Sequence, residues 1–168
     1  MYILTEESYK KISKSFKLIE SSHVIQAYFD IMYQTVETRI KLEKRDESWA
    51  STIATLNIKH HEHELVLSEH EFYLNSVEAK DFIKNKGEVF TEYHREIYEI
   101  DQENKFEIRI FKNGKDDKIC CYFDEVSEDF SIDDYINDYK TVDEKIMNEF
   151  NFAYEMDKDK VYEILKCF

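Results

Sequence analysis

Three basic residues fall on two segments whose side chains alternate between apolar and polar. Residues 35–43 read Thr-Val-Glu-Thr-Arg-Ile-Lys-Leu-Glu, so Glu37, Arg39 and Lys41 lie on one face of a predicted strand. Lys59 ends the next strand-like segment. Such a row of basic side chains can hold phosphate oxygens if the face lines a cavity, or simply contact water if it is open. The spacing of the residues leaves both interpretations open.

Two later strand-like segments add Arg95 and Arg109 to this basic set. Carboxylates that could coordinate Mg²⁺ or Mn²⁺ lie on segments of the same kind, namely Glu62, Glu64 and Glu107. If the faces converge, the bases would bind a polyphosphate and the carboxylates its metal ion. Burying so much charge is costly for each unpaired ion, whereas a solvated sheet face costs almost nothing.

Several classes of site are excluded by composition. The chain has 2 Gly and no Pro among its 168 residues, so it contains no glycine-rich phosphate loop and no dinucleotide-binding fingerprint. Neither a Gly-x-Ser-x-Gly frame nor a cysteine flanked by glycine occurs, which argues against a catalytic triad. Lys, Asn, Ile, Glu and Tyr are abundant, a composition typical of AT-rich genomes such as those of low-GC bacteria and their phages.

The net charge of −14 is unevenly distributed along the chain. Residues 1–60 carry +1, residues 61–112 carry −6 and residues 113–168 carry −9. Direct nucleic-acid binding needs a basic face and is therefore not expected. A basic protein partner suits the acidic C-terminal region better. Its candidate contact residues are Glu125, Glu128, Asp129, Asp133, Asp134, Tyr135, Asp138 and Tyr139.

The cysteines indicate a reducing compartment. Cys120 and Cys121 are adjacent, so on a strand they point to opposite faces and are poor disulfide partners. Buried reduced thiols are the expected state, and no apolar run reaches the length of a membrane span. We therefore expect a cytoplasmic protein.

The apolar periodicity predicts an α+β fold with a mostly antiparallel sheet. Thr5 is expected to cap a helix whose apolar stripe extends to Ile19, and Ser76 a second helix that ends at Gly87. Strand-like segments cover residues 24–30, 35–44, 51–59, 62–74, 90–101, 105–112 and 118–126, and helical patterns cover residues 132–139, 141–150 and 161–165. We expect a single domain over 1–168, in which an acidic helical extension, 127–168, follows the helix-and-sheet part, 1–126. Periodicity does not decide whether the sheet stays open or closes into a tunnel-like barrel.

Residues 4–126 resemble the CYTH, or triphosphate tunnel, superfamily. The similar segments are Leu4–Tyr9, Val24–Asp30, Val36–Lys41, Ala54–Lys59, Glu62-x-Glu64 and Phe106–Phe111. The superfamily includes bacterial triphosphatases, thiamine-triphosphate hydrolases and class IV adenylate cyclases. The resemblance implies a tunnel of antiparallel strands that binds a triphosphate with Mg²⁺ or Mn²⁺.

Three departures from the family pattern affect its metal-binding carboxylates. The first-strand Glu-x-Glu-x-Lys motif is absent, Arg109 occupies a position where aspartate is usual, and the segment Cys121–Asp124 has lost one carboxylate. We therefore expect a non-catalytic, acidic interaction or inhibitor protein on a degenerate tunnel-like scaffold, encoded by a phage and directed at a basic host protein that handles nucleic acid. The alternative is a metal-dependent triphosphate hydrolase or cyclase of the CYTH class.

Overall fold

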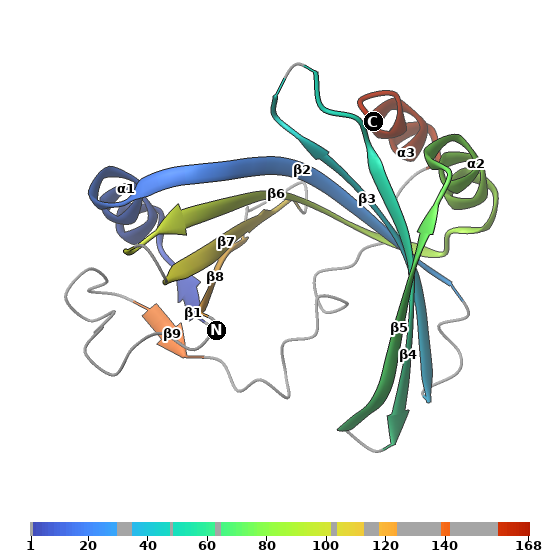
Figure 1. The fold of residues 1–168 in the computed structure, drawn as a ribbon, viewed down its shortest axis with the longest axis horizontal. Helices are drawn as coiled ribbons and strands as arrows, with labels where there is room; N and C mark the ends of the chain where they lie inside the picture. The colour runs from blue at the N-terminus through green and yellow to red at the C-terminus, as the bar shows by residue number, and fades with distance from the viewer. Residues whose placement is uncertain are drawn as a thin grey trace. The chain divides into compact units, whose positions relative to one another are not determined.

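The chain forms an antiparallel sheet with helices attached to it (Figure 1). In this computed structural model, the described residues are 2–29, 35–47, 49–62, 65–101, 104–112, 118–123, 139–141 and 158–168. Their elements are β1 (Tyr2–Leu4), α1 (Glu6–Ser15), β2 (Lys17–Phe29), β3 (Val36–Arg45), β4 (Ile53–Glu62), β5 (Leu65–Leu74), α2 (Ser76–Lys86), β6 (Val89–Glu99), β7 (Lys105–Phe111), β8 (Lys118–Phe123), β9 (Tyr139–Thr141) and α3 (Lys158–Leu165).

The strand order is β5-β4-β3-β2-β6-β7-β8-β1-β9. Neighbours such as β3 and β4, β4 and β5, and β7 and β8 pair antiparallel, which confirms the predicted α+β class and sheet type. The order has two end strands, β5 and β9, and the sheet is not closed into a barrel. The described residues therefore form an open sheet, one of the two arrangements that periodicity did not distinguish.

The chain divides into two compact units, and each is described by itself below. Unit 1 comprises residues 1–22 and 93–151, and unit 2 comprises residues 23–92 and 152–168. Strands β2 and β6 each contribute residues to both units. The single domain expected from the sequence stays a prediction.

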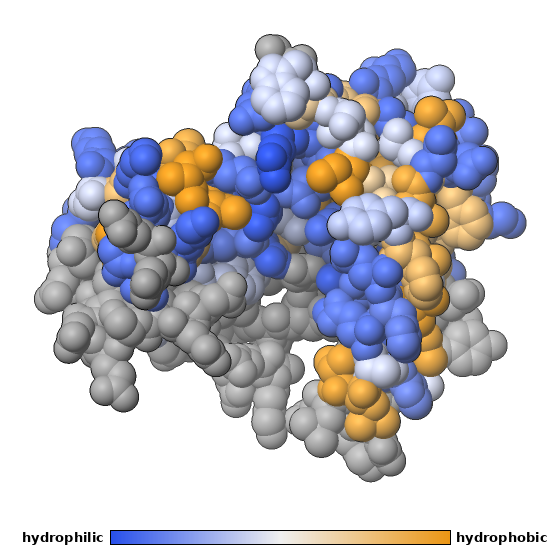
Figure 2. Space-filling model, in the orientation of Figure 1, coloured by the Kyte–Doolittle hydropathy of each residue, from blue (hydrophilic) through white to orange (hydrophobic). Residues whose placement is uncertain are grey.

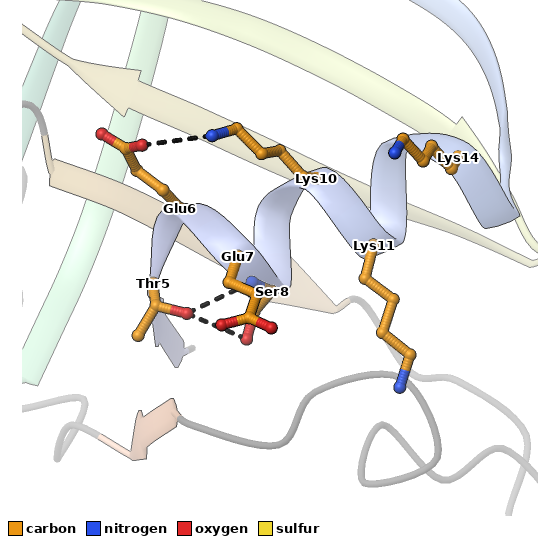
Figure 3. Close-up of a pocket in the computed structure, with 7 residues that line it drawn as sticks. All are labelled: Thr5, Glu6, Glu7, Ser8, Lys10, Lys11 and Lys14. Atoms are coloured by element: carbon orange, nitrogen blue, oxygen red, sulfur yellow. Dashed lines mark hydrogen bonds and ion pairs between the residues drawn. The ribbon is translucent and has the colours of Figure 1, made fainter.

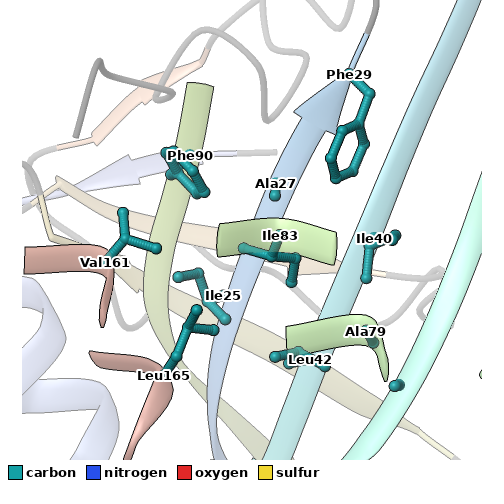
Figure 4. Packing of buried hydrophobic residues seen from close by; sticks show 11 residues of the cluster. Ile25, Ala27, Phe29, Ile40, Leu42, Ala79, Ile83, Phe90, Val161 and Leu165 are labelled. Carbon is teal, nitrogen blue, oxygen red and sulfur yellow. The ribbon is translucent and has the colours of Figure 1, made fainter. Parts of the chain in front are cut away.

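The core of unit 2 lies between two helices and one face of its strands (Figure 4). Figure 4 shows α2 and α3 contributing side chains to a cluster with β2, β3 and β6. Its buried members are Ile25, Ala27, Phe29, Ile40, Leu42, Ala54, Ala79, Ile83, Phe90, Val161 and Leu165. Since strand side chains alternate between faces, β3 buries Ile40 and Leu42 here and presents Arg39 and Lys41 on the opposite face.

The C-terminal residues are tied to the β3–β4 part of unit 2. The Lys44 ammonium donates to the Cys167 carbonyl at 3.0 Å, and the Thr52 hydroxyl donates to the Phe168 carbonyl. The Phe168 ring lies 4.7 Å from the imidazole of His23, centroid to centroid. The predicted C-terminal helical piece is confirmed as α3, and these contacts hold the residues that follow it.

Helix α2 begins at Ser76, the residue predicted as its cap. Asn75, rather than Ser76, is the N-cap, because its side-chain oxygen accepts from the amides of Val77 and Glu78. Gly87 ends the helix as predicted, and its amide donates to the Ile83 carbonyl.

Helix α1 is shorter than the sequence predicts. Thr5 caps it as expected, but the helix ends at Ser15, and β2 begins at Lys17. The helical interpretation of residues 16–19 was therefore wrong, because Phe16 is the C-cap of α1 and residues 17–19 begin β2. Helix α1 closes the core of unit 1, whose buried members are Leu4, Ile12, Tyr98, Phe106, Ile108, Ile119 and Cys121.

Two short strands of unit 1 were not predicted. Strand β1 pairs with β8, and β9 pairs with the other edge of β1. Tyr139 therefore belongs to a strand and not to the helix predicted over 132–139, whose other residues lie outside the described part of the chain. The pattern of residues 142–150 also lies outside it. Of the helices that the structure describes, none is long and apolar enough to cross a membrane.

Candidate ligand-binding face

The polar face of unit 2 is formed by alternate residues of adjacent strands. Pairing of β3 with β4 places Arg39 beside Asn57 and Lys41 beside Thr55. In the same register Glu37 lies opposite Lys59. Paired residues point to the same side of a sheet, so these side chains share one face. The three basic residues that the sequence singled out in this part of the chain are thus neighbours.

Each of these cations has a carboxylate partner. The atom pairs are Arg39 Nη1 and Glu37 Oε1 at 3.8 Å, Lys41 Nζ and Glu43 Oε2 at 3.4 Å, and Lys59 Nζ and Glu69 Oε1 at 3.5 Å. The side chains of Arg39 and Glu37 are both 14% exposed, and that of Glu43 is 13% exposed. Charged side chains on an open sheet face are normally well exposed. The Arg39–Glu37 part of the face is therefore occluded, whereas Glu69, whose side chain is 45% exposed, contacts solvent.

Neutral polar side chains complete the face and are almost fully buried. They are Gln26, Tyr28, Thr55, Asn57 and Thr91, each no more than 4% exposed. Within the described structure, the Thr55 hydroxyl forms no hydrogen bond and the Asn57 side-chain oxygen accepts none. The Asn57 side-chain amide donates to Glu69 at 2.8 Å. Leaving a buried polar atom unpaired costs about 1–3 kcal/mol. Such atoms indicate a partner that does not belong to the described residues.

Two ionisable groups report on the electrostatics of this face. Burial raises the pKa of Tyr28 to about 12, although the nearby Arg39 charge opposes the shift. Burial alone would raise the pKa of Glu69, but the Asn57 hydrogen bond and the Lys59 charge outweigh it and hold that pKa below its usual range. At neutral pH the face therefore combines neutral hydroxyls with fixed positive and negative charges.

The basic residues predicted in unit 1 form a separate cluster. Arg95 donates from Nε to Glu107 and from Nη1 to Glu20, both at 2.8 Å, and Arg109 also bonds with Glu107. The rings of Tyr93 and Tyr122 lie near the Arg109 guanidinium, with centroids 5.4 and 4.4 Å away.

This cluster joins two arginines to two carboxylates, so its formal charges balance. Glu107, predicted as a metal ligand, instead bridges the two arginines. No group of three or more metal-ligating side chains occurs among the residues that the structure describes. Those residues therefore do not form the metal site that the CYTH resemblance implies.

A buried carboxylate under α1 was not expected from the sequence. Glu96 is 8% exposed and accepts from the Tyr9 hydroxyl at 3.0 Å and from the Tyr98 hydroxyl at 2.7 Å. Burial, reinforced by the Glu96 charge, raises the pKa of Tyr9 to about 12. This group is well paired, in contrast to the polar face of unit 2.

The remaining candidate residues are not described by the structure. This applies to Glu64, to the side chain of Glu62, and to the predicted partner-binding set Glu125, Glu128, Asp129, Asp133, Asp134, Tyr135 and Asp138. For Tyr139 only the backbone, in β9, is described. These residues stay predictions.

A hollow of about 750 Å³ lies along α1 (Figure 3). Its described lining comes from α1 and its N-cap, as Figure 3 shows, and consists of Thr5, Glu6, Glu7, Ser8, Lys10, Lys11 and Lys14. Lys10 Nζ lies 3.4 Å from Glu6 Oε2, and both side chains are more than two-thirds exposed. A solvated helix face of this kind is no evidence of a site.

Comparison with known proteins identifies the fold alone. No protein-family model matches the chain, and no curated protein matches its sequence. It is similar to the solved structure of the PH1819 protein from Pyrococcus horikoshii OT3, with a TM-score of 0.56 and 11% identity over 86% of this chain and 93% of that one. It is also similar to the hypothetical protein NE1496, with a TM-score of 0.53 and 14% identity over 79% of this chain and 84% of that one. The resemblance to the CYTH superfamily stays a prediction.

Proposed function

We propose that the chain binds a ligand containing a chain of phosphates on the polar face of unit 2. The observation behind this proposal is the burial of a face made of charged and neutral polar groups, two of whose atoms have no partner in the described structure. Folding alone does not favour such a face, because an apolar one of the same shape is often as stable or more stable. A buried polar surface of this kind is typical of a functional site.

The ligand would be held by charge-assisted hydrogen bonds. Arg39, Lys41 and Lys59 supply cationic donors from two neighbouring strands. The Thr55 hydroxyl, beside Lys41 in the register, supplies a neutral donor to the same phosphate chain. Without a ligand, the partner carboxylates neutralise the three basic side chains. A bound phosphate would displace these carboxylates. The proposal is one of binding and contains no metal-dependent step.

Isothermal titration with tripolyphosphate and ATP tests this proposal. Arg39→Ala should weaken binding by about tenfold to a hundredfold, the value of one charged hydrogen bond. Arg45→Ala is the matched control, because Arg45 is exposed at the end of the same strand and should leave binding unchanged. Absence of binding by the unmodified chain, or equal loss in both variants, would refute the proposal.

The strongly acidic C-terminal region supports a second candidate function. Residues 113–168 carry −9 of the net charge of −14. We propose, as the alternative, a non-catalytic inhibitor whose acidic residues bind a basic host protein that handles nucleic acid. Its test is a pull-down with nucleic-acid-binding proteins of a low-GC bacterium at increasing salt. An association that is absent, or insensitive to salt, would contradict this function.

A further inference from the structure

Strand β5 has an outer edge that no described strand pairs with. It is the end strand of the sheet and pairs on its inner side with β4. Exposed apolar side chains are concentrated on it, with Val66, Leu67, Phe72 and Tyr73 between 51% and 81% exposed. An end strand presents a row of backbone N–H and C=O groups that another extended chain can pair with.

The two faces of β5 differ in chemistry. Glu69 and Glu71 pair with Lys59 and Asn57, so both glutamates lie on the polar face. Phe72 pairs with Leu56 and lies on the apolar face. Figure 2 shows the corresponding surface over β4 and β5 as hydrophilic along the middle of the strands and apolar toward their hairpin. A strand added at this edge would meet Glu69, Glu71 and Tyr73 on one face, and Phe72 and His70 on the other.

An apolar groove of about 380 Å³ adjoins the apolar face. It lies between α2 and the strands, and its described lining is Phe29, Thr38, Ile40, Leu56, Leu74, Glu78, Ala79 and Phe82. Phe82 and Phe29 form one wall, with ring centroids 5.1 Å apart. Leu74 of β5 lines the groove and lies on the same face as Phe72, so a side chain beside this end of β5 would lie next to the groove.

We propose that β5 is the docking site for an extended segment of a basic partner protein, in which basic and apolar residues alternate. The basic residues would lie opposite Glu69 and Glu71, and the apolar residues opposite Phe72 and toward the groove. Backbone pairing provides affinity, and the alternation provides specificity. This proposal needs no phosphate, because it concerns the outer edge of β5, although Glu69 and Glu71 lie on the same polar face as Arg39 and Lys59.

A second copy of the chain fits the same edge poorly. Two-fold antiparallel pairing about any residue from Glu69 to Glu71 places glutamates of the two copies directly opposite each other. Like charges in such cross-strand pairs are destabilising. A partner with basic residues at alternate positions removes this repulsion, and the net charge of −14 favours its approach.

The test uses a fluorescent peptide in which lysine alternates with valine. Controls are a peptide of the same composition with its lysines and valines in two blocks, and the alternating peptide N-methylated at every second residue. Anisotropy should show binding of the first peptide alone, and hydrogen exchange should show new protection of the amides in β5. Equal binding of the block peptide would mean charge attraction alone and would overturn the proposal.

Two charge-reversal variants localise the contact. Glu71→Lys should weaken binding of the alternating peptide by about tenfold or more. Asp81→Lys, which reverses an exposed carboxylate on α2, should leave it unchanged. Equal effects of the two variants, or sedimentation showing a dimer that excludes the peptide, would also overturn the proposal.

Discussion

The buried hydroxyl of Thr55 allows a direct test of whether the polar face of unit 2 is built for a ligand. Thr55 is 2% exposed, and its Oγ1 has no hydrogen-bond partner in the described structure. Thr55→Val replaces that hydroxyl with a methyl group of nearly the same shape. The variant removes a desolvation cost of about 1–3 kcal/mol and retains the packing. We therefore expect the free energy of unfolding to rise by about 1–3 kcal/mol.

Thr52→Val is the matched control in the same unit. The Thr52 hydroxyl donates to the Phe168 carbonyl, so its removal breaks a formed hydrogen bond. This variant should lower the free energy of unfolding by about 1 kcal/mol. The two identical substitutions are thus predicted to have opposite signs.

Urea denaturation followed by far-UV circular dichroism measures both variants, with and without saturating tripolyphosphate. Thr55→Val should be more stable alone but gain less from the ligand, because it has lost one donor to phosphate. If Thr55→Val is destabilised as Thr52→Val is, the hydroxyl is already paired and our explanation of the buried face is wrong. If it is stabilised but binds tripolyphosphate as the unmodified chain does, Thr55 is not a ligand contact.

Three further predictions concern the rest of the structure. Glu107→Gln should lower the free energy of unfolding by about 2–3 kcal/mol, because it leaves two occluded arginines without their shared carboxylate. Glu99→Gln, which removes an exposed pair with a lysine, should lower it by at most about 1 kcal/mol, and urea denaturation compares the two variants. Cys120 should resist a thiol reagent at pH 8, since burial raises its pKa to about 12, whereas the exposed Cys167 should react; mass spectrometry of the labelled peptides distinguishes them. The pKa of Tyr28 is raised from 10 to about 12 in the folded chain, so its contribution to stability is complete below pH 10 and should be lost as the pH rises from 10 to 12. In urea denaturation, Tyr28→Phe should make this loss of stability with pH smaller.

Most strands could be predicted from the sequence because alternation of side chains is a local signal. Strand β3 differs from its predicted range by one residue at each end, and the hydrophobic face that α2 covers follows from the same pattern. Strand β1 could not be recognised, since three residues are too few to show a period. The length of β2 was also missed, because Ile19 fits the helical stripe of α1 and only pairing across the sheet places it in a strand.

The candidate site was predicted in part. Arg39, Lys41 and Lys59 were identified from their charge, and the register places them on one face, which their spacing had left undecided. Gln26 and Thr55 were missed, although each alternates with apolar residues of its strand, because a single neutral polar residue is common in a sheet. The sequence did not show which carboxylate pairs with which cation, because ion pairing depends on distances across the sheet and not on spacing along the chain.

The division of the chain also affects how it can fold during synthesis. Residues 93–151 of unit 1 are made before Val161 and Leu165, which complete the core of unit 2. Unit 1 in turn needs residues 1–22 together with that later segment. Each unit contains two segments that are far apart in the chain, so it cannot complete its core until the later segment has been synthesised. Until then, the apolar residues of the earlier segment stay partly exposed. Such non-local closure slows folding and increases the need for chaperones.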